Sequence, residues 1–299
     1  MSRWVKIPLY IVGALVGLVA LSAAGLYASS SMKISKTYDV PLTEITIPKD
    51  SATIARGQHL VEAIGKCQDC HGEDLGGKVF IDDPGLGRVS ASNLTSGGVG
   101  GQYTDAEFLR VLRHGVKRDG HGARIMPSED WQYLADDDAA AIIAYIRSVP
   151  AVQRELPPFE LRPLGRALVG AGILPMISVE LIDHDRVHPK TMPADTSLEY
   201  GKYLANIGGC TGCHGPGLSG GRVPGTPPEM PAAANISPTG IGHYSDAEIE
   251  AILRTGVRPS GVKVDDFMPW RATAKMDTIE MRATIKFLRS VPPREFGNR

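Results

Sequence analysis

Two short cysteine-containing segments constrain this chain more than any other feature. They read CQDCH at residues 67–71 and CTGCH at residues 210–214, and together they contain all four cysteines of the 299-residue chain. Two cysteines separated by two residues and followed by histidine form the attachment pattern of c-type haem. One turn of backbone presents both thiols to the vinyl groups on one edge of the porphyrin. The same turn carries the imidazole beneath the ring, where it can bind the iron.

A zinc site and a redox-active cysteine pair are the alternatives for such segments. Structural zinc normally takes four nitrogen or sulfur ligands from clustered pairs, whereas these pairs begin at residues 67 and 210 and each has its own histidine. A thioredoxin-like pair would lie in a βαβ pattern, which the chain lacks. The sequence therefore predicts two covalently bound haem c groups.

Composition suits two globular domains that each hold such a group. Hydrophobic residues make up 42% of the chain and charged residues 22%, and the length allows about two domains. Aromatic residues are only 6%, so a porphyrin in each domain would supply apolar volume to the cores. The formal net charge of −1 provides no field that favours nucleic acid. With every cysteine assigned to a thioether, no disulfide is expected.

The N-terminus carries an apolar segment with two possible roles. Residues 7–32 contain no charge, and residues 9–28 would rise about 30 Å as a helix, which is the hydrocarbon thickness of a bilayer. A cleaved signal peptide is one interpretation, because small residues at 23–29 could form a cleavage site. We favour an uncleaved anchor over residues 1–32, because the run exceeds the apolar core of a typical signal peptide. Arg3 and Lys6 would then stay in the cytoplasm.

Export of the remaining chain follows from either interpretation. Residues 33–52 are polar and contain prolines, which predicts a tether. The expected location is the bacterial inner membrane, with a single N-terminal span and the haem domains in the periplasm.

The rest of the chain is an internal duplication. A first domain at residues 53–150 and a second at 196–299 repeat the same motifs in the same order. The motifs NLT at 93–95 and NIS at 235–237 occupy equivalent places, so we expect structural asparagines near the haem edge rather than glycosylation sites. YTDAE at 103–107 corresponds to YSDAE at 244–248, and both match a helix capping box.

Further elements of the first repeat follow from local signals. We expect a helix over residues 53–66, a glycine-rich loop over 72–101, and a short helix after Thr104 that stops at Gly115. Three aspartates at 136–138 suit the positive end of a helix that Pro150 closes.

The connecting segment at residues 151–195 is proline-punctuated, and its middle is apolar with few charges. It reads as a strap packed across both haem domains or as a docking surface for a membrane subunit, and we favour the strap.

The sixth iron ligand decides what each haem can do. In the first repeat His59, His114, His121 and Met126 are candidates, but the duplication pairs the three histidines with Tyr203, Thr255 and Val262. Only Met126 has a residue of the same type, Met268, at the equivalent position of the second repeat. Both methionines precede a proline, which favours an extended loop. The expected haem-binding residues are Cys67, Cys70, His71, Met126, Cys210, Cys213, His214 and Met268. Of these, His71, Met126, His214 and Met268 would bind the two irons.

Each repeat resembles a class I cytochrome c domain, with CxxCH after the first helix, a Met-Pro loop and a closing helix. The resemblance implies an all-α fold in which Gly57 crosses the last helix at Tyr145 and Gly201 crosses at Phe287. The whole chain resembles the membrane-anchored multihaem cytochrome c subunits of bacterial periplasmic dehydrogenases of the alcohol and gluconate type. It differs in having two haem motifs where those subunits commonly have three.

These features predict an electron-transfer protein rather than an enzyme. Histidine–methionine ligation closes both faces of the iron, so the protein would relay single electrons from a periplasmic dehydrogenase or other donor to the respiratory chain, on the quinone or terminal-oxidase side. The alternative is a dihaem enzyme, such as a cytochrome c peroxidase or a thiosulfate-oxidising cytochrome, which needs an open or displaceable face. A haem-based sensor is a third option, but no signalling module follows Pro293.

Overall fold

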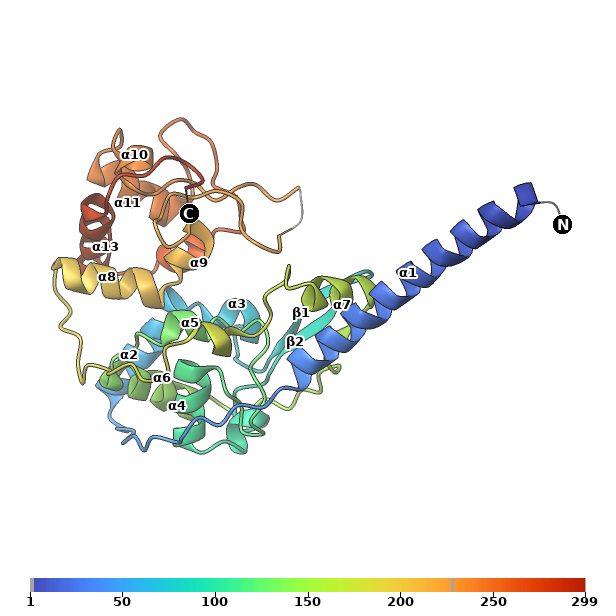
Figure 1. The fold of residues 1–299 in the computed structure, drawn as a ribbon. Helices are drawn as coiled ribbons and strands as arrows, with labels where there is room; N and C mark the ends of the chain where they lie inside the picture. Colours follow the sequence, from blue (N-terminus) through green and yellow to red (C-terminus); the bar gives the residue numbers. More distant parts are fainter. Residues whose placement is uncertain (1–2, 227–228, 299) are drawn as a thin grey trace.

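A long single helix projects from a body of two helical lobes in the computed structural model (Figure 1). The structure describes residues 3–226 and 229–298, and only the backbone of residues 5 and 6. Residues 1 and 2, at the start of the expected anchor, and the side chain of Lys6 lie outside the described part. The fold is mainly helical, as expected, but it includes a small sheet, so the all-α prediction holds only in part.

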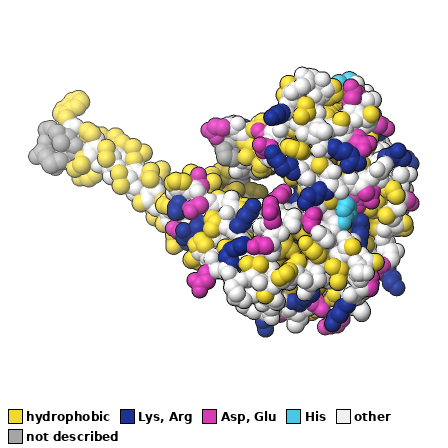
Figure 2. All heavy atoms as spheres, turned by 180° about the vertical axis from the view of Figure 1, so that it is seen from behind, with side chains coloured by type: hydrophobic (Ala, Val, Ile, Leu, Met, Phe, Trp, Pro, Cys, Tyr) yellow, Lys and Arg dark blue, Asp and Glu magenta, His cyan; other side chains and the backbone are white. Residues whose placement is uncertain are grey.

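Helix α1 (Arg3–Ser35) extends past the predicted anchor and runs to the edge of the first lobe. Its stretch Ile7–Ser35 is long and apolar enough to cross a membrane, and its apolar window is not buried against the rest of the protein. Apolar side chains cover this projecting helix in the space-filling view (Figure 2). Length and composition are thus compatible with the predicted span, which they support only weakly.

The first lobe contains the helices expected from the sequence, with one irregularity. Helix α2 (Ser51–His59) begins at its Asp50 cap and continues as the wider π-helical turn η1 (Leu60–Ile64). The remaining helices of the lobe are α3 (Cys67–His71), α4 (Asp105–His114), α5 (Ser128–Trp131) and α6 (Asp136–Ser148). A 3-10 turn, η2 (Val99–Gly101), precedes α4. The Thr104–Glu107 capping box and the left-handed Gly115 cap are present as predicted.

The prediction of a glycine-rich loop over residues 72–101 is wrong in its middle. Strands β1 (Lys78–Asp83) and β2 (Gly87–Ala91) form an antiparallel hairpin there, and β3 (Glu160–Leu161) pairs with β2. The third strand lies some 70 residues downstream, so the pairing depends on a contact that local sequence signals do not reveal.

The second lobe repeats the helical part of the first. Its helices are α8 (Leu198–Ile207), α9 (Cys210–His214), α10 (Pro238–Ile241), α11 (Asp246–Thr255), α12 (Trp270–Thr273) and α13 (Thr278–Ser290). The predicted second capping box is present at Ser245 and Glu248.

Both expected helix crossings are confirmed by backbone contact. A Cβ atom on Gly57 would lie 1.9 Å from the Ala141 carbonyl oxygen and 2.9 Å from the Tyr145 Cβ. On Gly201 it would lie 2.0 Å from the Ala283 carbonyl oxygen. Each domain therefore needs glycine where its first helix crosses its last.

The connecting segment folds as a strap that contacts both lobes and α1. Besides β3 it contains α7 (Pro163–Gly170) and the 3-10 turn η3 (Ser178–Leu181). Near the C-terminal end of the strap, the Pro189 and Lys190 carbonyls accept hydrogen bonds from the first turn of α6. Leu174 lies against Gly225 of the second lobe. These contacts agree with the favoured interpretation of residues 151–195.

The two lobes share one hydrophobic core, so their interface is apolar and buried. Tyr203 of α8 is buried, and its hydroxyl donates to the Asp138 carboxylate of α6 at 2.7 Å. The lobes are therefore held in a defined relative position, which fixes how their two candidate haem sites face each other.

Candidate haem sites

The two attachment segments have the same local fold. Each CxxCH forms one helical turn, α3 or α9, between two residues with positive φ. Lys66 (φ 54°) and Gly72 (φ 82°) bound the first turn, and Gly209 (φ 66°) and Gly215 (φ 81°) bound the second. The backbone thus isolates a single turn, which is the shape that presents two thiols and an imidazole to one porphyrin edge.

Both candidate proximal histidines are oriented by a backbone carbonyl. The Nδ1 atom of His71 lies 2.7 Å from the Ser92 carbonyl oxygen, and that of His214 lies 2.7 Å from the Ala234 carbonyl oxygen. A metal-binding histidine usually donates its other ring N–H to such a group, which fixes the ring and its tautomer. Burial lowers the pKa of His71 below its usual range, which keeps the imidazole neutral and able to act as a ligand.

In the first lobe the structure brings all four predicted haem-binding residues to one cavity. Cys67, Cys70, His71 and Met126 line a partly open cavity of about 210 Å³. Its remaining wall is mainly apolar and includes Phe80, Val89, Phe108, Leu112, Ile142 and Phe159. A flat apolar ring with one exposed edge suits this donor set and this wall, so the residues fit haem c.

Two walls of that cavity were not predicted from the sequence. Phe80 belongs to β1 and Phe159 precedes β3, so the sheet and the strap close the haem cavity. The run of three apolar residues at 79–81 was the one available signal for this role.

The Met126 loop has an unusual backbone conformation. Ile125 has φ +60°, which is costly for a β-branched residue. Strap residues hold the loop there, because the Ile125 amide donates to the Met176 carbonyl at 2.7 Å and the Ser178 hydroxyl donates to the Met126 carbonyl at 2.9 Å. Met126 is thereby held at the cavity wall.

The corresponding loop of the second lobe has similar geometry without the strap. The Val264 amide bonds the Gly256 carbonyl at 2.7 Å, as Ala123 bonds Gly115 in the first lobe at 2.6 Å. Pro269 has nearly the same backbone angles as Pro127, and each precedes a one-turn helix. Met268 is half-buried beside the exposed Phe267.

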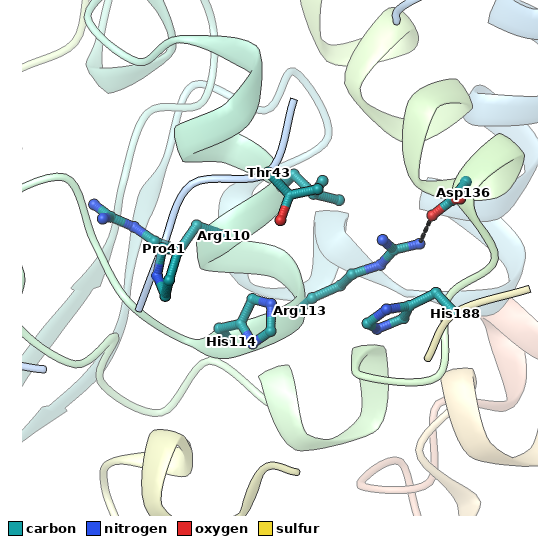
Figure 3. A pocket seen from close by; sticks show the side chains of 8 residues that line it. Pro41, Thr43, Arg110, Arg113, His114, Asp136 and His188 are labelled. Carbon is teal, nitrogen blue, oxygen red and sulfur yellow. Dashed lines mark hydrogen bonds and ion pairs between the residues drawn. The ribbon is translucent and has the colours of Figure 1, made fainter. Parts of the chain in front are cut away.

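The histidines that competed for the sixth position lie elsewhere. His114 lines a separate hollow with Arg113, Asp136 and His188, on the other face of α4 from the haem cavity (Figure 3). Its Nδ1 faces the Nδ1 of His184 at 3.0 Å. Burial, reinforced by the neighbouring histidines and arginines, lowers the pKa of His114 to about 4.

His59 and His121 are also engaged away from the cavity. His59 lies 2.7 Å from the Glu280 carboxylate at the lobe interface, and His121 pairs with Asp119 near the tether. Among the four first-lobe candidates, only Met126 lines the cavity that the structure describes.

The two attachment segments meet at the lobe interface. The Lys66 ammonium donates to the Gly208 carbonyl, which joins the residue before the first motif to the approach of the second. Asp130 of α5 reaches the same place, since a Cβ on Gly209 would lie 2.7 Å from its carboxylate. Burial, with repulsion from Glu129, raises the pKa of Asp130 to about 7 against the opposing charge of Lys66. Asp130 carries no signal in the sequence, because its role depends on the partner lobe.

Both lobes match families of haem proteins. Residues 52–146 match the family described as "Cytochrome C oxidase, cbb3-type, subunit III", and residues 198–292 match the family described as "Cytochrome c".

Similar curated proteins extend over most of the chain. The "Alcohol dehydrogenase (quinone), cytochrome c subunit" of Gluconobacter oxydans is 29% identical over 81% of this chain and 55% of its own length. The "Fructose dehydrogenase cytochrome subunit" of Gluconobacter japonicus is 26% identical over 91% of this chain and 58% of its own. A "Gluconate 2-dehydrogenase cytochrome c subunit" of Pantoea cypripedii is 33% identical over 33% of this chain and 24% of its own. The chain thus spans little more than half the length of the relatives that it matches most fully.

Proposed function

We propose that this c-type cytochrome, which carries two covalently bound haem c groups, is the electron-transfer subunit of a membrane-bound periplasmic dehydrogenase. Its relatives bear the names of cytochrome subunits of alcohol, fructose and gluconate dehydrogenases. The substrate would be oxidised on a separate subunit, and this chain would pass the electrons to the respiratory chain.

Each lobe supplies the same set of residues for one haem. Cys67 and Cys70 would form the thioethers of the first haem, and Cys210 and Cys213 those of the second. When bound, each haem iron accepts and releases one electron. His71 and His214 are the proposed proximal ligands, held by their carbonyl partners. Met126 and Met268 are the proposed distal ligands.

One observation carries the proposal of a relay. The attachment segments adjoin at the lobe interface, where Lys66 bonds Gly208 within a shared core. Two independent cytochrome domains on a flexible linker would not need such a contact. A fixed juxtaposition of the attachment turns supports electron passage from one site to the other without a diffusional step.

Two methionine loops also favour electron transfer over catalysis. A methionine in the sixth position leaves no open face for peroxide or thiosulfate. The first of these loops is further fixed by the strap through Ser178. We therefore propose that the chain itself carries no catalytic residue.

The proposed location is the inner membrane, with α1 as the anchor. Its apolar length supports this placement, and covalent haem attachment outside the bacterial cytoplasm supports a periplasmic position for both domains. We propose domain limits of 53–150 and 196–299, separated by the strap.

Purification from native membranes tests the proposal. A dehydrogenase subunit should co-purify, and one alcohol, sugar or sugar acid should reduce both haems in the complex but not in the isolated chain. Mass spectrometry of the denatured chain should retain two haem masses. Rapid carbon monoxide binding to the reduced chain, together with peroxide turnover, would instead make one haem catalytic.

A second candidate partner follows from the match of the first lobe. The description of that family names an oxidase subunit, so a terminal oxidase could be the protein that holds this cytochrome. Co-purification with a haem–copper oxidase and no dehydrogenase would replace the dehydrogenase proposal.

A further inference from the structure

The strap helix α7 is fastened to the end of α1 that approaches the haem domains. Gly170, at the end of α7, lies so close to Leu26 that a Cβ would be 2.3 Å from the Leu26 carbonyl oxygen. The Ser29 hydroxyl donates to the Gly170 carbonyl at 2.9 Å, and the Lys33 ammonium donates to the Val169 carbonyl at 3.0 Å. The two helices also lie side by side in Figure 1. These contacts fix the height of α7 along the axis of α1.

That height places the end of α7 at the proposed membrane boundary. If residues 9–28 cross the hydrocarbon layer, Leu26 lies about 3 Å inside its edge, at 1.5 Å per helical residue. Gly170 is at the level of Leu26, so the chain that follows it leaves α7 close to the lipid. We call residues 171–173 the tip; Leu174, which follows it, packs against Gly225 of the second lobe.

The tip has the composition of a lipid contact. No charged residue occurs between Arg166 and Glu180. The apolar side chain of Ile173 is 57% exposed in the structure. A bilayer interface would cover it, as it covers the apolar face of a monotopic helix.

The backbone amides at the tip already have internal partners. The amides of residues 171–174 donate to the carbonyls of residues 167–169 at 2.9–3.2 Å. The Val169 and Gly170 carbonyls accept from Lys33 and Ser29. These amides and the last carbonyls of α7 therefore need no partner from the lipid, which offers none in its hydrocarbon layer.

Basic side chains lie beside the tip, in contact with Tyr27 and with the end of α7. Arg166 stacks over the Tyr27 ring at 4.3 Å, and its guanidinium also reaches the Ser31 hydroxyl at 3.2 Å. With Lys33, it lies where a snorkelling cation meets phospholipid head groups.

We propose that the tip, residues 171–173, inserts into the phospholipid interface beside α1 and forms a second membrane contact. The inference rests on the proposed membrane span. Two contacts at different positions prevent the first haem domain from rotating about α1. They therefore fix which face of that domain is presented to partners above the membrane.

Cysteine accessibility in the full-length holoprotein tests the tip directly. All four native cysteines are used in haem attachment, so a single new thiol can be followed by mass spectrometry. Ile173→Cys is compared with Val187→Cys, which lies in the same strap at a 92% exposed position. In phospholipid nanodiscs we expect a charged maleimide to label position 173 at least about tenfold more slowly than position 187, because lipid excludes the reagent. A lipid-soluble maleimide should label both.

Val16→Cys, in the middle of the span, separates the two levels of the proposal. If position 16 is protected and position 173 reacts as fast as position 187, the tip is in water and the inference fails while the anchor stands. If position 16 also reacts quickly, the proposed span itself fails. Protection of position 173 in native membranes but not in nanodiscs would show that a protein, not lipid, covers the tip, and would also overturn the inference.

Discussion

At the scale of single residues, the distal methionines decide what the irons can do. Met126 follows a residue whose φ of +60° costs on the order of 1 kcal/mol, and backbone strain of this kind persists where the surroundings fix it. We expect Met126→His to keep the first haem low-spin while lowering its potential by roughly 0.1 V or more, within the ~0.8 V range that axial ligands cover. A spectroscopic redox titration should resolve the shift in one of two components.

His121→Ala serves as the control for that substitution. His121 pairs with Asp119 and does not line the haem cavity, so both potentials should stay unchanged. If Met126→His left the potential unaltered and His121→Ala produced a high-spin signal, His121 would be the ligand instead.

Asp130 couples the second site to pH. Its pKa of about 7, raised by burial and by Glu129, means that a negative charge appears beside Gly209 as pH rises through neutrality. A nearby negative charge stabilises the ferric form, so the potential of the second haem should fall as pH increases. We expect a change of tens of millivolts, since ~59 mV corresponds to a tenfold shift for one electron.

Potentials measured on either side of neutral pH check this effect. Asp130→Asn should abolish most of the dependence of the second haem near pH 7. A dependence that survives in Asp130→Asn would assign it to another group.

Residue-level prediction from the sequence is possible where the signal is local or duplicated. The cysteines and histidines follow from spacing, and the structure places Cys67, Cys70, His71 and Met126 around one cavity. Asp130 and Glu280 were missed because their roles arise across the lobe interface. Nothing in the residues next to either carboxylate distinguishes it from an exposed one.

At the scale of elements, the strap distinguishes the two methionine loops. Ser178 and Met176 hold the Met126 loop, whereas no strap residue is bonded to Met268 among the described contacts. Removing the Ser178 hydroxyl should loosen the first loop by about 1 kcal/mol, the typical value of one hydrogen bond. We therefore expect Ser178→Ala to speed imidazole binding to the oxidised first haem by about fivefold, since 1.4 kcal/mol corresponds to tenfold.

Ser148→Ala is a matched control, because its hydroxyl bonds only the Tyr145 carbonyl within its own helix. Stopped-flow absorption should show no change in that variant. Equal rates in Ser178→Ala and the parent protein would mean that the strap does not restrain the ligand loop.

The helices could be predicted because their caps and periods are local, as the two capping boxes show. The pairing of β3 could not, because the register of β2 with β3 joins Arg88 to Glu160 across a long stretch of chain. The π-helical turn after His59 was also missed, since residues 60–64 have ordinary helical composition.

At the scale of the whole molecule, the duplication creates a nearly symmetric lobe interface. Asp138 of α6 and Glu280 of α13 occupy corresponding positions, and each contacts the first helix of both lobes. Asp138 accepts from Arg56 and from Tyr203. Glu280 accepts from Arg56 and faces His59 at 2.7 Å.

The pKa of the buried Glu280 is controlled by its hydrogen-bond and charge partners. Its side chain is 1% exposed. Burial alone would raise the pKa of Glu280, but the His59 hydrogen bond and charge, the Asp277 amide and Arg56 outweigh it and lower that pKa. The hydrogen bond to Glu280 raises the pKa of His59 despite its burial. The pair therefore stabilises the interface most between these two pKa values, and this stability is lost as pH rises through the pKa of His59 or falls through that of Glu280.

Glu280→Gln should therefore reduce the free energy of unfolding by about 3 kcal/mol near neutral pH, because it leaves His59 without its carboxylate and leaves Arg56 with Asp138 alone. The control is Glu250→Gln, whose pair with Arg254 lies at the surface of α11 and should cost less than about 1 kcal/mol. Chemical denaturation followed by circular dichroism measures both.

Below the lowered pKa of Glu280 the parent carboxyl becomes neutral, so the difference between parent and Glu280→Gln should shrink there. A difference that stays constant with pH would mean that the substitution acts through packing rather than charge, and the ionic account of the lobe interface would fail.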